Sequence, residues 1–260
     1  MYVTVKLEGG LGNKLFQVAA MLGFAEKYGH TPVFLQTWLD KPESHTNARA
    51  VQDYFPHVAV LITDIDSSWT TVREKDNHAF IYEPLPFVHG NVYLYGWFQT
   101  ERYFPSYKLM PEILTNWTGE FDGSHAAFLH VRRGDYLNEL CRHHWVDLCG
   151  YIRRCIMVYP AGTVFVVCSD DLAWCKENLP RMYGDLVGAE CWRWIELDNY
   201  ETLAVMMRCG RGGICANSTF SWWGAYFGMR ELVCMPALWG YWPMPPAVDI
   251  WPNWAVRLPV

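Results

Sequence analysis

The sequence has no run of 18 or more apolar residues, and neither a basic n-region nor an apolar h-region precedes the strand-like stretch that begins at Tyr2. We therefore expect no membrane span and no secretory signal. The sequence also has no C-x-x-C pair among its nine cysteines. An odd number of such cysteines is typical of free thiols in a reducing compartment, so we expect a cytoplasmic protein.

Positive charge is scarce as well. The 21 Lys and Arg side chains are outnumbered by 27 Asp and Glu side chains, which gives a formal net charge of −6. This balance excludes the general basic field that holds nucleic acid or an anionic membrane surface. Any phosphate must therefore be bound by a local group of residues. The hydrophobic share of 51% still predicts a globular chain with a well-buried core.

The amino-terminal half opens with a strand pattern at 2–7, a glycine-rich turn, a helical pattern at 14–28 that Gly29 ends, and a second strand at 33–35. This order predicts a βαβ unit. Further strands are expected near 58–62, around 80–82 and at 91–98, and polar loops at 40–47 and 67–77.

Elements alternate strictly in the carboxyl-terminal half, which predicts a parallel sheet covered by helices. We expect strands at 126–131, 163–168, 192–197, 213–216 and 231–235, and helices at about 145–158, 171–178, 199–209 and 218–228. The polar stretch 115–124 is the candidate linker. We expect one α/β half at 1–118, a second, nucleotide-binding half at 119–235, and a segment at 236–260, rich in proline and tryptophan, that packs back across both.

Ionisable side chains follow the apolar strand 126–131 directly. Arg132 and Arg133 are adjacent there, and two guanidinium groups at a strand end favour an anion such as phosphate. Gly134 allows a turn, and Asp135 can fix the direction of one arginine; Arg133 is expected to point away from Arg132 and to pair with Asp135. A surface ion pair, or a chance Arg-Gly-Asp tripeptide, explains the same residues.

Two other strands of this half also end in polar groups. Asp170 and Asp171 follow one of them, and the turn from Asn217 to Ser221 follows another. Because the carboxyl ends of parallel strands meet at one edge of the sheet, these groups and Arg132 are expected to converge on a nucleotide. Both the acidic pair and the turn could equally cap the helices that follow them.

The glycines at 9, 10 and 12 expose bare backbone at the start of the first helix, beside Asn13, whose side chain both donates and accepts hydrogen bonds. Their spacing differs from the dinucleotide fingerprint G-x-G-x-x-G. The glycines could instead have a purely steric role in the turn.

Five stretches taken in order resemble the α-1,2-fucosyltransferases of glycosyltransferase family 11, and the similarity runs from residue 3 to about residue 258. They are EGGLGNKLFQ at 8–17, GWFQTERYF at 96–104, AAFLHVRRGDY at 126–136, VFVVCSDD at 164–171 and NSTFSWWGA at 217–225. The resemblance implies a GT-B arrangement, in which two Rossmann-like α/β halves hold a sugar nucleotide in the cleft. It implies inverting, metal-independent transfer of L-fucose from GDP-β-L-fucose to a glycan hydroxyl, α-1,2 to galactose.

The resemblance also implies roles for individual residues. The catalytic candidates are Arg132, which would stabilise charge on the departing β-phosphate, and Asn13, which would orient the reaction. The donor-binding candidates are His130, Arg132, Asp135, Asp170, Asp171, Asn217, Ser218, Thr219, Phe220, Ser221, Gly10 and Gly12. No cofactor beyond the GDP-fucose donor and no metal ion is implied, since arginines replace the cation.

The residues leave three points open. Core-fucosylating relatives have a catalytic glutamate five residues after the motif aspartate, where this chain has Leu140 with Glu139 beside it. The cysteines and histidines within 141–149 have zinc-binding side chains, but their spacing is not that of a standard zinc site. Another GDP-6-deoxyhexose could be the donor, or the chain could be a non-catalytic nucleotide- or glycan-binding module.

Overall fold

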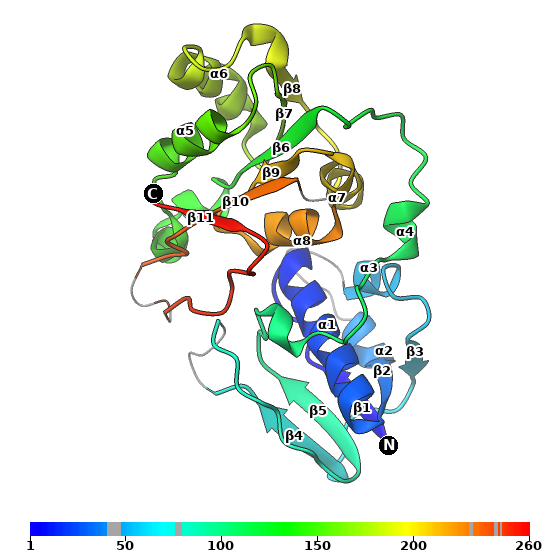
Figure 1. Ribbon diagram of the computed structural model, residues 1–260. Helices are drawn as coiled ribbons and strands as arrows, with labels where there is room; N and C mark the ends of the chain where they lie inside the picture. Colours follow the sequence, from blue (N-terminus) through cyan, green and yellow to red (C-terminus); the bar gives the residue numbers. More distant parts are fainter. Residues whose placement is uncertain (41–47, 76–79, 229–230, 242–243, 245) are drawn as a thin grey trace. The chain divides into compact units, whose positions relative to one another are not determined.

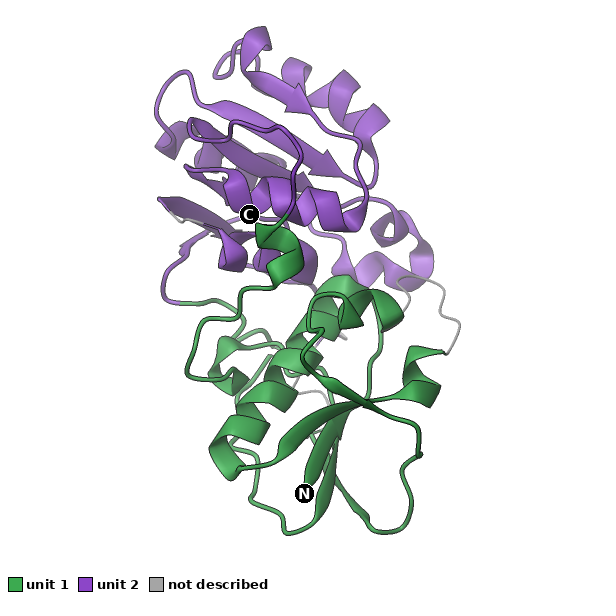
Figure 2. Cartoon of the chain, turned by 90° about the vertical axis from the view of Figure 1, so that its right-hand side faces the viewer, with its two compact units in different colours: residues 1–116, 245–252 green, residues 117–244, 253–260 purple. Residues whose placement is uncertain are grey.

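The computed structural model describes residues 1–40, 48–75, 80–228, 231–241, 244 and 246–260. They form two compact units (Figure 2). Unit 1 comprises Met1–Asn116 and Pro245–Pro252, and unit 2 comprises Trp117–Met244 and Asn253–Val260. Unit 1 ends at Asn116, two residues before the boundary that the sequence predicted at 118. The carboxyl-terminal segment contributes residues to both units.

Unit 1 contains a five-stranded parallel sheet (Figure 1). Its strands are β1 (Tyr2–Val5), β2 (Thr31–Leu35), β3 (Ala59–Leu61), β4 (Trp69–Arg73) and β5 (Asn91–Tyr95), in the spatial order β3-β2-β1-β5-β4. Its helices are α1 (Leu11–Tyr28), α2 (Gln36–Leu39), α3 (Ala48–Gln52), η1 (Glu101–Tyr103) and α4 (Glu112–Thr115). β1 therefore has β2 on one side and β5, a strand from much later in the chain, on the other.

Helix α1 packs on β1 and β2 and is buried along most of its length. It begins after Gly10, three residues earlier than the pattern predicted, and ends at Gly29, whose φ of 71° suits glycine. The Gly29 N–H donates to the carbonyl of Ala25 at 2.9 Å. This long buried helix fixes the loop that precedes it relative to the sheet.

Unit 2 contains a six-stranded parallel sheet in the order β11-β10-β9-β6-β7-β8. Its strands are β6 (Ala126–Val131), β7 (Val164–Ser169), β8 (Trp192–Trp194), β9 (Gly212–Ile214), β10 (Leu232–Pro236) and β11 (Val256–Leu258). Its helices are η2 (Asp135–Leu137), η3 (Glu139–His144), α5 (Cys149–Val158), α6 (Leu172–Tyr183), η4 (Ala189–Cys191), α7 (Asn199–Arg208) and α8 (Thr219–Phe227). Counted from β6 as strand one, the spatial order is 3-2-1-4-5-6, that of the doubly wound nucleotide-binding fold.

The α/β class with two Rossmann-like halves is thereby confirmed, and β6 has the bounds that the sequence predicted. The strand expected around 80–82 is wrong. The backbone there bonds to the carboxyl-terminal segment instead, because the Tyr82 N–H donates to Asp249 Oδ2 at 2.8 Å and the Asp249 N–H donates to the Phe80 carbonyl at 2.7 Å.

Two strands were not predicted, β4, which lies inside a stretch expected to be a polar loop, and β11. Only Val72 of β4 is buried, so that strand carries little apolar signal. Most of the loop expected at 40–47, and residues 76–77 of the loop expected at 67–77, lie outside the described residues.

All nine cysteines are described and are free thiols. Within the described residues, no helix combines the length and apolar character needed to cross a membrane.

Candidate functional site

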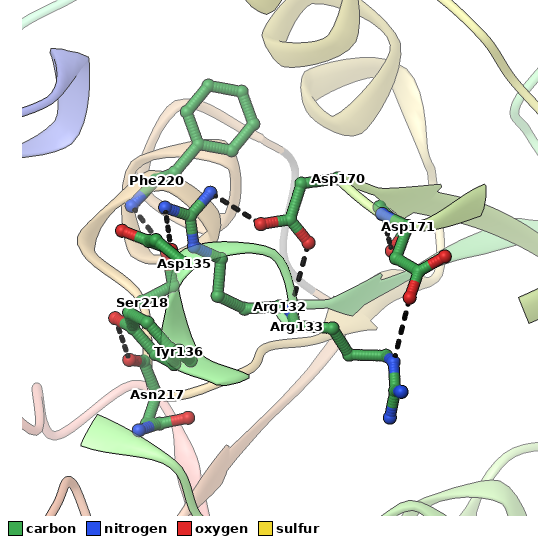
Figure 3. A network of polar contacts seen from close by, with 10 residues as sticks. Arg132, Arg133, Asp135, Tyr136, Asp170, Asp171, Asn217, Ser218 and Phe220 are labelled. Atoms are coloured by element: carbon green, nitrogen blue, oxygen red, sulfur yellow. Dashed lines mark hydrogen bonds and ion pairs between the residues drawn. The ribbon is translucent and has the colours of Figure 1, made fainter. Parts of the chain in front are cut away.

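The candidate site of unit 2 lies where the direction of strand order reverses. β6 pairs with β7 on one side and with β9 on the other, and the chain leaves β6 and β9 toward opposite neighbours. In open α/β sheets, ligands bind outside the carboxyl ends of the strands at this point. The residues from Arg132 follow β6, and the turn from Asn217 to Ser221 follows β9 (Figure 3).

Arg132 is held between two carboxylates from different segments. Its Nη2 lies 2.6 Å from Asp135 Oδ1, and its Nη1 lies 2.8 Å from Asp170 Oδ2 (Figure 3). The other oxygen of Asp170 accepts the backbone N–H of Arg133 at 2.9 Å. The Arg132 side chain is 30% exposed, so protein contacts orient it while it is not closed off from a ligand.

Gly134 makes this arrangement sterically possible. A Cβ atom at this position would lie 2.5 Å from Asp170 Oδ2. No side chain fits at that separation, so the turn after β6 approaches Asp170 closely only because residue 134 is glycine.

Arg133 points away from Arg132, as strand alternation predicted, but its expected partner was wrong. Its Nε lies 3.1 Å from Asp171 Oδ2, and its guanidinium carbon lies 3.8 Å from the centre of the Trp174 ring. Asp135 pairs with Arg132 instead, because the chain turns at Gly134, before η2, and brings residue 135 within reach of Arg132. Arg133 therefore ties the strand end to the start of α6.

Asp170 and Asp171 have different surroundings although they are adjacent. Asp170 contacts Arg132, whereas Asp171 is the N-cap of α6 and accepts the Trp174 N–H at 3.2 Å. The capping role therefore belongs to Asp171, and Asp170 remains within reach of the candidate ligand.

His130 is the buried polar group of the site. Its side chain is only 6% exposed, and its ring centre lies 5.8 Å from that of Phe220. The pKa of His130 is lowered to about 4, mainly by burial; the charge of Asp170 opposes this shift and the charge of Arg132 adds to it. Its Nδ1 atom has no hydrogen-bond partner among the described residues. A buried nitrogen without a partner costs free energy, and a ligand that bonds to it would recover that cost.

The turn before α8 shows capping and internal bonds. Ser218 is the N-cap, and its hydroxyl accepts the Phe220 N–H at 3.4 Å. Ser221 is fully buried, and its hydroxyl donates to the Ser218 carbonyl at 3.2 Å. The amide nitrogen of Asn217 donates to the carbonyls of His144 at 2.7 Å and Trp239 at 2.8 Å. These contacts make the turn rigid.

The backbone of Thr219 and Phe220 forms the first turn of α8, where N–H groups attract an anion.

Tyr136 belongs to the site although the sequence did not single it out. Its ring lies 5.2 Å from the Arg132 guanidinium, and its hydroxyl donates to the Asn217 carbonyl at 3.2 Å. Burial raises the pKa of Tyr136 to about 12, so the phenol stays protonated. Tyr136 thus joins the two strand ends. The sequence signal that could have identified Tyr136 is an aromatic residue four positions after Arg132.

The candidates of unit 1 are held by their own network. Lys14 is fully buried and donates from Nζ to the Gly9 carbonyl. Asn13 Oδ1 accepts from the side chain of Gln99 at 2.9 Å. Gly10 is the N-cap of α1 and Gly12 lies in its first turn. Sequence reasoning missed Lys14 and Gln99, whose polar side chains are buried among apolar neighbours.

The segment around η3 supports the site through His144, whose carbonyl accepts the Asn217 side chain, and not through a carboxylate. Leu140 is 90% exposed, and Glu139 lies beside it in η3. His144 stacks on Tyr136 with ring centres 5.2 Å apart. Among the described residues, no three His, Cys, Asp or Glu side chains form a group that could hold a metal ion.

Residues 1–237 match the sequence model of glycosyl transferase family 11. An α-1,2-colitosyltransferase of Escherichia coli is 26% identical over 266 residues, covering 88% of this chain and 89% of that protein. The galactoside α-(1,2)-fucosyltransferase 1 of Homo sapiens is 26% identical over 256 residues, covering 88% of this chain but only 66% of that protein. The crystal structure of NodZ α-1,6-fucosyltransferase soaked with GDP-fucose superposes with a TM-score of 0.46 at 15% identity, covering 87% of this chain and 92% of that one.

Proposed function

The chain belongs to glycosyl transferase family 11 and is a glycosyltransferase, and we propose that it transfers L-fucose from GDP-β-L-fucose to a hydroxyl of a galactose-containing glycan, forming an α-1,2 linkage with inversion and without a metal ion. The observation that carries the proposal is the oriented Arg132 beside the first turn of α8, at the reversal point of a nucleotide-type sheet. We place the reaction in the cytoplasm, because nine free thiols suit a reducing compartment.

In the proposed reaction, the acceptor oxygen attacks C1 of fucose while the bond from C1 to the β-phosphate oxygen breaks. GDP leaves with the bonding electrons, and the acceptor hydroxyl releases its proton to solvent water. Negative charge therefore grows on the diphosphate during bond cleavage. Arg132 and the N–H groups of the first turn of α8 are placed to stabilise that charge, which is electrostatic catalysis by preorganised donors.

Arg132 has donors to spare for this task. A guanidinium group carries five N–H donors, and Arg132 forms ion pairs with Asp135 through Nη2 and with Asp170 through Nη1, while Asp135 Oδ1 accepts no hydrogen bond among the described residues. Asp170 also holds the backbone of Arg133, so it fixes the direction of Arg132 from the strand end. We assign Asp170 to positioning Arg132 rather than to reading the base. His130 supplies a second polar contact for the donor through its unpartnered Nδ1.

A second donor is worth testing because the bacterial relative is named a colitosyltransferase. Colitose is L-fucose without its 3-hydroxyl group. A site that bonds to a sugar hydroxyl rejects the analogue lacking it by a large factor, whereas an apolar wall discriminates weakly.

The test is a transfer assay on a glycan array with labelled GDP-fucose, repeated with GDP-colitose. We expect a product on terminal galactosides, and NMR of that product should show an α anomer. A β anomer would contradict inversion. GDP binding without turnover on any acceptor would contradict the proposed reaction.

A further inference from the structure

Unit 1 also brings together the carboxyl ends of two strands that are far apart in the sequence. Its order β3-β2-β1-β5-β4 places β1 between β2, the next strand of the chain, and β5, a late one (Figure 1). Residues Val3 to Val5 pair with Val92 to Leu94 in parallel register. The carboxyl ends of β1 and β5 therefore meet at a position where open α/β sheets bind ligands.

A large exposed aromatic side chain stands at this end of the sheet. Trp97 follows β5 and is 38% exposed. A Cβ atom on Gly9 would lie 3.2 Å from the Trp97 ring and 2.6 Å from Asn13 Nδ2. The φ of Gly9 is 76°, a conformation that favours glycine. The missing side chain at residue 9 thus lets the indole and the Asn13 carboxamide approach each other.

The turn that carries Trp97 is firmly held. The carboxylate of Glu74 accepts the N–H of Trp97 at 2.7 Å and that of Phe98 at 3.1 Å. Phe98 has a φ of 52°, which is uncommon for a residue with a side chain. Gln99 then donates to Asn13 Oδ1 at 2.9 Å. The backbone that carries the exposed indole is therefore preorganised, so little backbone entropy is lost when a ligand covers it.

The neighbouring face is aromatic and polar. Tyr95 is half-buried, with the Lys6 ammonium 4.6 Å from its ring centre and the Arg73 guanidinium 4.2 Å from it. Lys6 also pairs with Glu8, so these two side chains carry no net charge together. Burial raises the pKa of Glu74 to about 7, so this carboxyl is not counted as a fixed charge. Aromatic rings beside a neutralised ion pair suit a neutral ligand better than a polyanion.

We propose that Trp97, with Glu8, Asn13 and Tyr95, forms the subsite for the acceptor sugar, a neutral pyranose whose C–H face stacks on the indole. These four residues are called the subsite below. A pyranose presents apolar C–H groups on one face and hydroxyl groups at its edge. The indole suits the first, and the carboxamide of Asn13 and the carboxylate of Glu8 suit the second. The inference rests on the proposed function, because it names the residues that receive the acceptor.

Trp97→Ala tests the subsite. We expect the KM for a galactoside acceptor to rise about tenfold, equivalent to ~1.4 kcal/mol, while GDP affinity and the slow hydrolysis of GDP-fucose stay unchanged. Trp97→Phe should recover part of the loss, because a smaller ring still stacks. The matched control is Tyr107→Ala: Tyr107 is 52% exposed in the same unit and lies near Glu26 at the opposite end of α1. It should leave the acceptor KM unchanged.

A second measurement does not depend on turnover. Saturation-transfer NMR with methyl β-galactoside should detect binding to the wild-type chain and to Tyr107→Ala, but not to Trp97→Ala. The melting temperature of Trp97→Ala should equal that of the wild type, which shows that the variant is folded. Normal galactoside binding and a normal acceptor KM in Trp97→Ala would overturn the subsite, even if the wild type transfers fucose. A third outcome separates the two proposals. If the wild type transfers no fucose but binds the galactoside, and Trp97→Ala abolishes this binding, the subsite is upheld and the proposed reaction is refuted.

Discussion

The Oδ2 atom of Asp170 lies 2.8 Å from Nη1 of Arg132, so the acidic residue after β7 orients the arginine after β6. The other oxygen of the same carboxylate accepts the Arg133 N–H, which prevents Asp170 from rotating away. Adjacent parallel strands thus fix a guanidinium direction before any ligand binds. A donor fixed in advance needs no reorganisation during the reaction.

Arg132→Ala should lower turnover by on the order of 10²–10³, the usual scale for one lost transition-state donor, while GDP affinity falls less. Arg132→Lys should rescue poorly, because an ammonium keeps the charge but loses the planar fork. Steady-state kinetics and GDP titration measure both quantities. Arg153→Ala is the control, since Arg153 pairs with Asp185 on the surface of the same unit. A fully active Arg132→Ala would refute the assignment.

Asp170→Asn should lower turnover by roughly tenfold, because it keeps an oxygen for the Arg133 N–H but loses the charge that orients Arg132. Asp171→Asn is its adjacent control. Asparagine caps helices about as well as aspartate, so α6 should keep its start and turnover should stay near that of the wild type. Equal losses in the two variants would show that Asp170 acts through stability alone.

Arg133→Ala should lose stability rather than activity. The change removes the contact to Asp171 and the stacking on Trp174, which together are worth about 1 kcal/mol at a partly exposed site. Urea unfolding should show the loss, and turnover below the transition should be unchanged. A variant that unfolds like the wild type yet cannot transfer fucose would place Arg133 in the chemistry.

Transfer should survive EDTA. Arg132 provides positive charge at the site, and the strand-end carboxylates are already engaged, Asp170 by arginine and Asp171 by the start of α6. Initial rates with and without the chelator should agree. Loss of activity that Mg²⁺ or Mn²⁺ restores would show that a cation shares the work of Arg132.

His130 should make the fold less stable in acid. Its pKa falls from 6.5 to about 4 on folding, so the unfolded chain binds the proton more strongly. This contribution to stability is complete above pH 6.5 and is lost as the pH falls toward 4. The unfolding free energies of the wild type and of His130→Gln should therefore converge, or cross, as the pH falls from 6.5 to about 4. A pH-independent difference would show that the imidazole is not held neutral by burial.

Sequence reasoning worked best where burial is uniform. All six residues of β6 are buried, so an apolar run with sharp ends defined the strand correctly. It failed where partners are remote: the backbone around Tyr82 bonds to Asp249, 167 positions away, and no local pattern carries that information. The convergence of strand ends was predictable from parallel topology. The pairing of Asp135 with Arg132 instead of Arg133 was not predictable, because it depends on the turn at Gly134 that follows the strand.

The sheet of unit 2 depends on a strand that the ribosome makes late. β11 pairs with β10 from Cys234 to Pro236, yet the chain between them contributes residues 245–252 to unit 1. During synthesis, the edge of β10 therefore stays unpaired until residue 258 has left the exit tunnel. Exposed edges recruit other chains, so this interval is when the nascent protein is most open to aggregation and to chaperones. Separately expressed halves cut at residue 236 would carry the same open edge permanently.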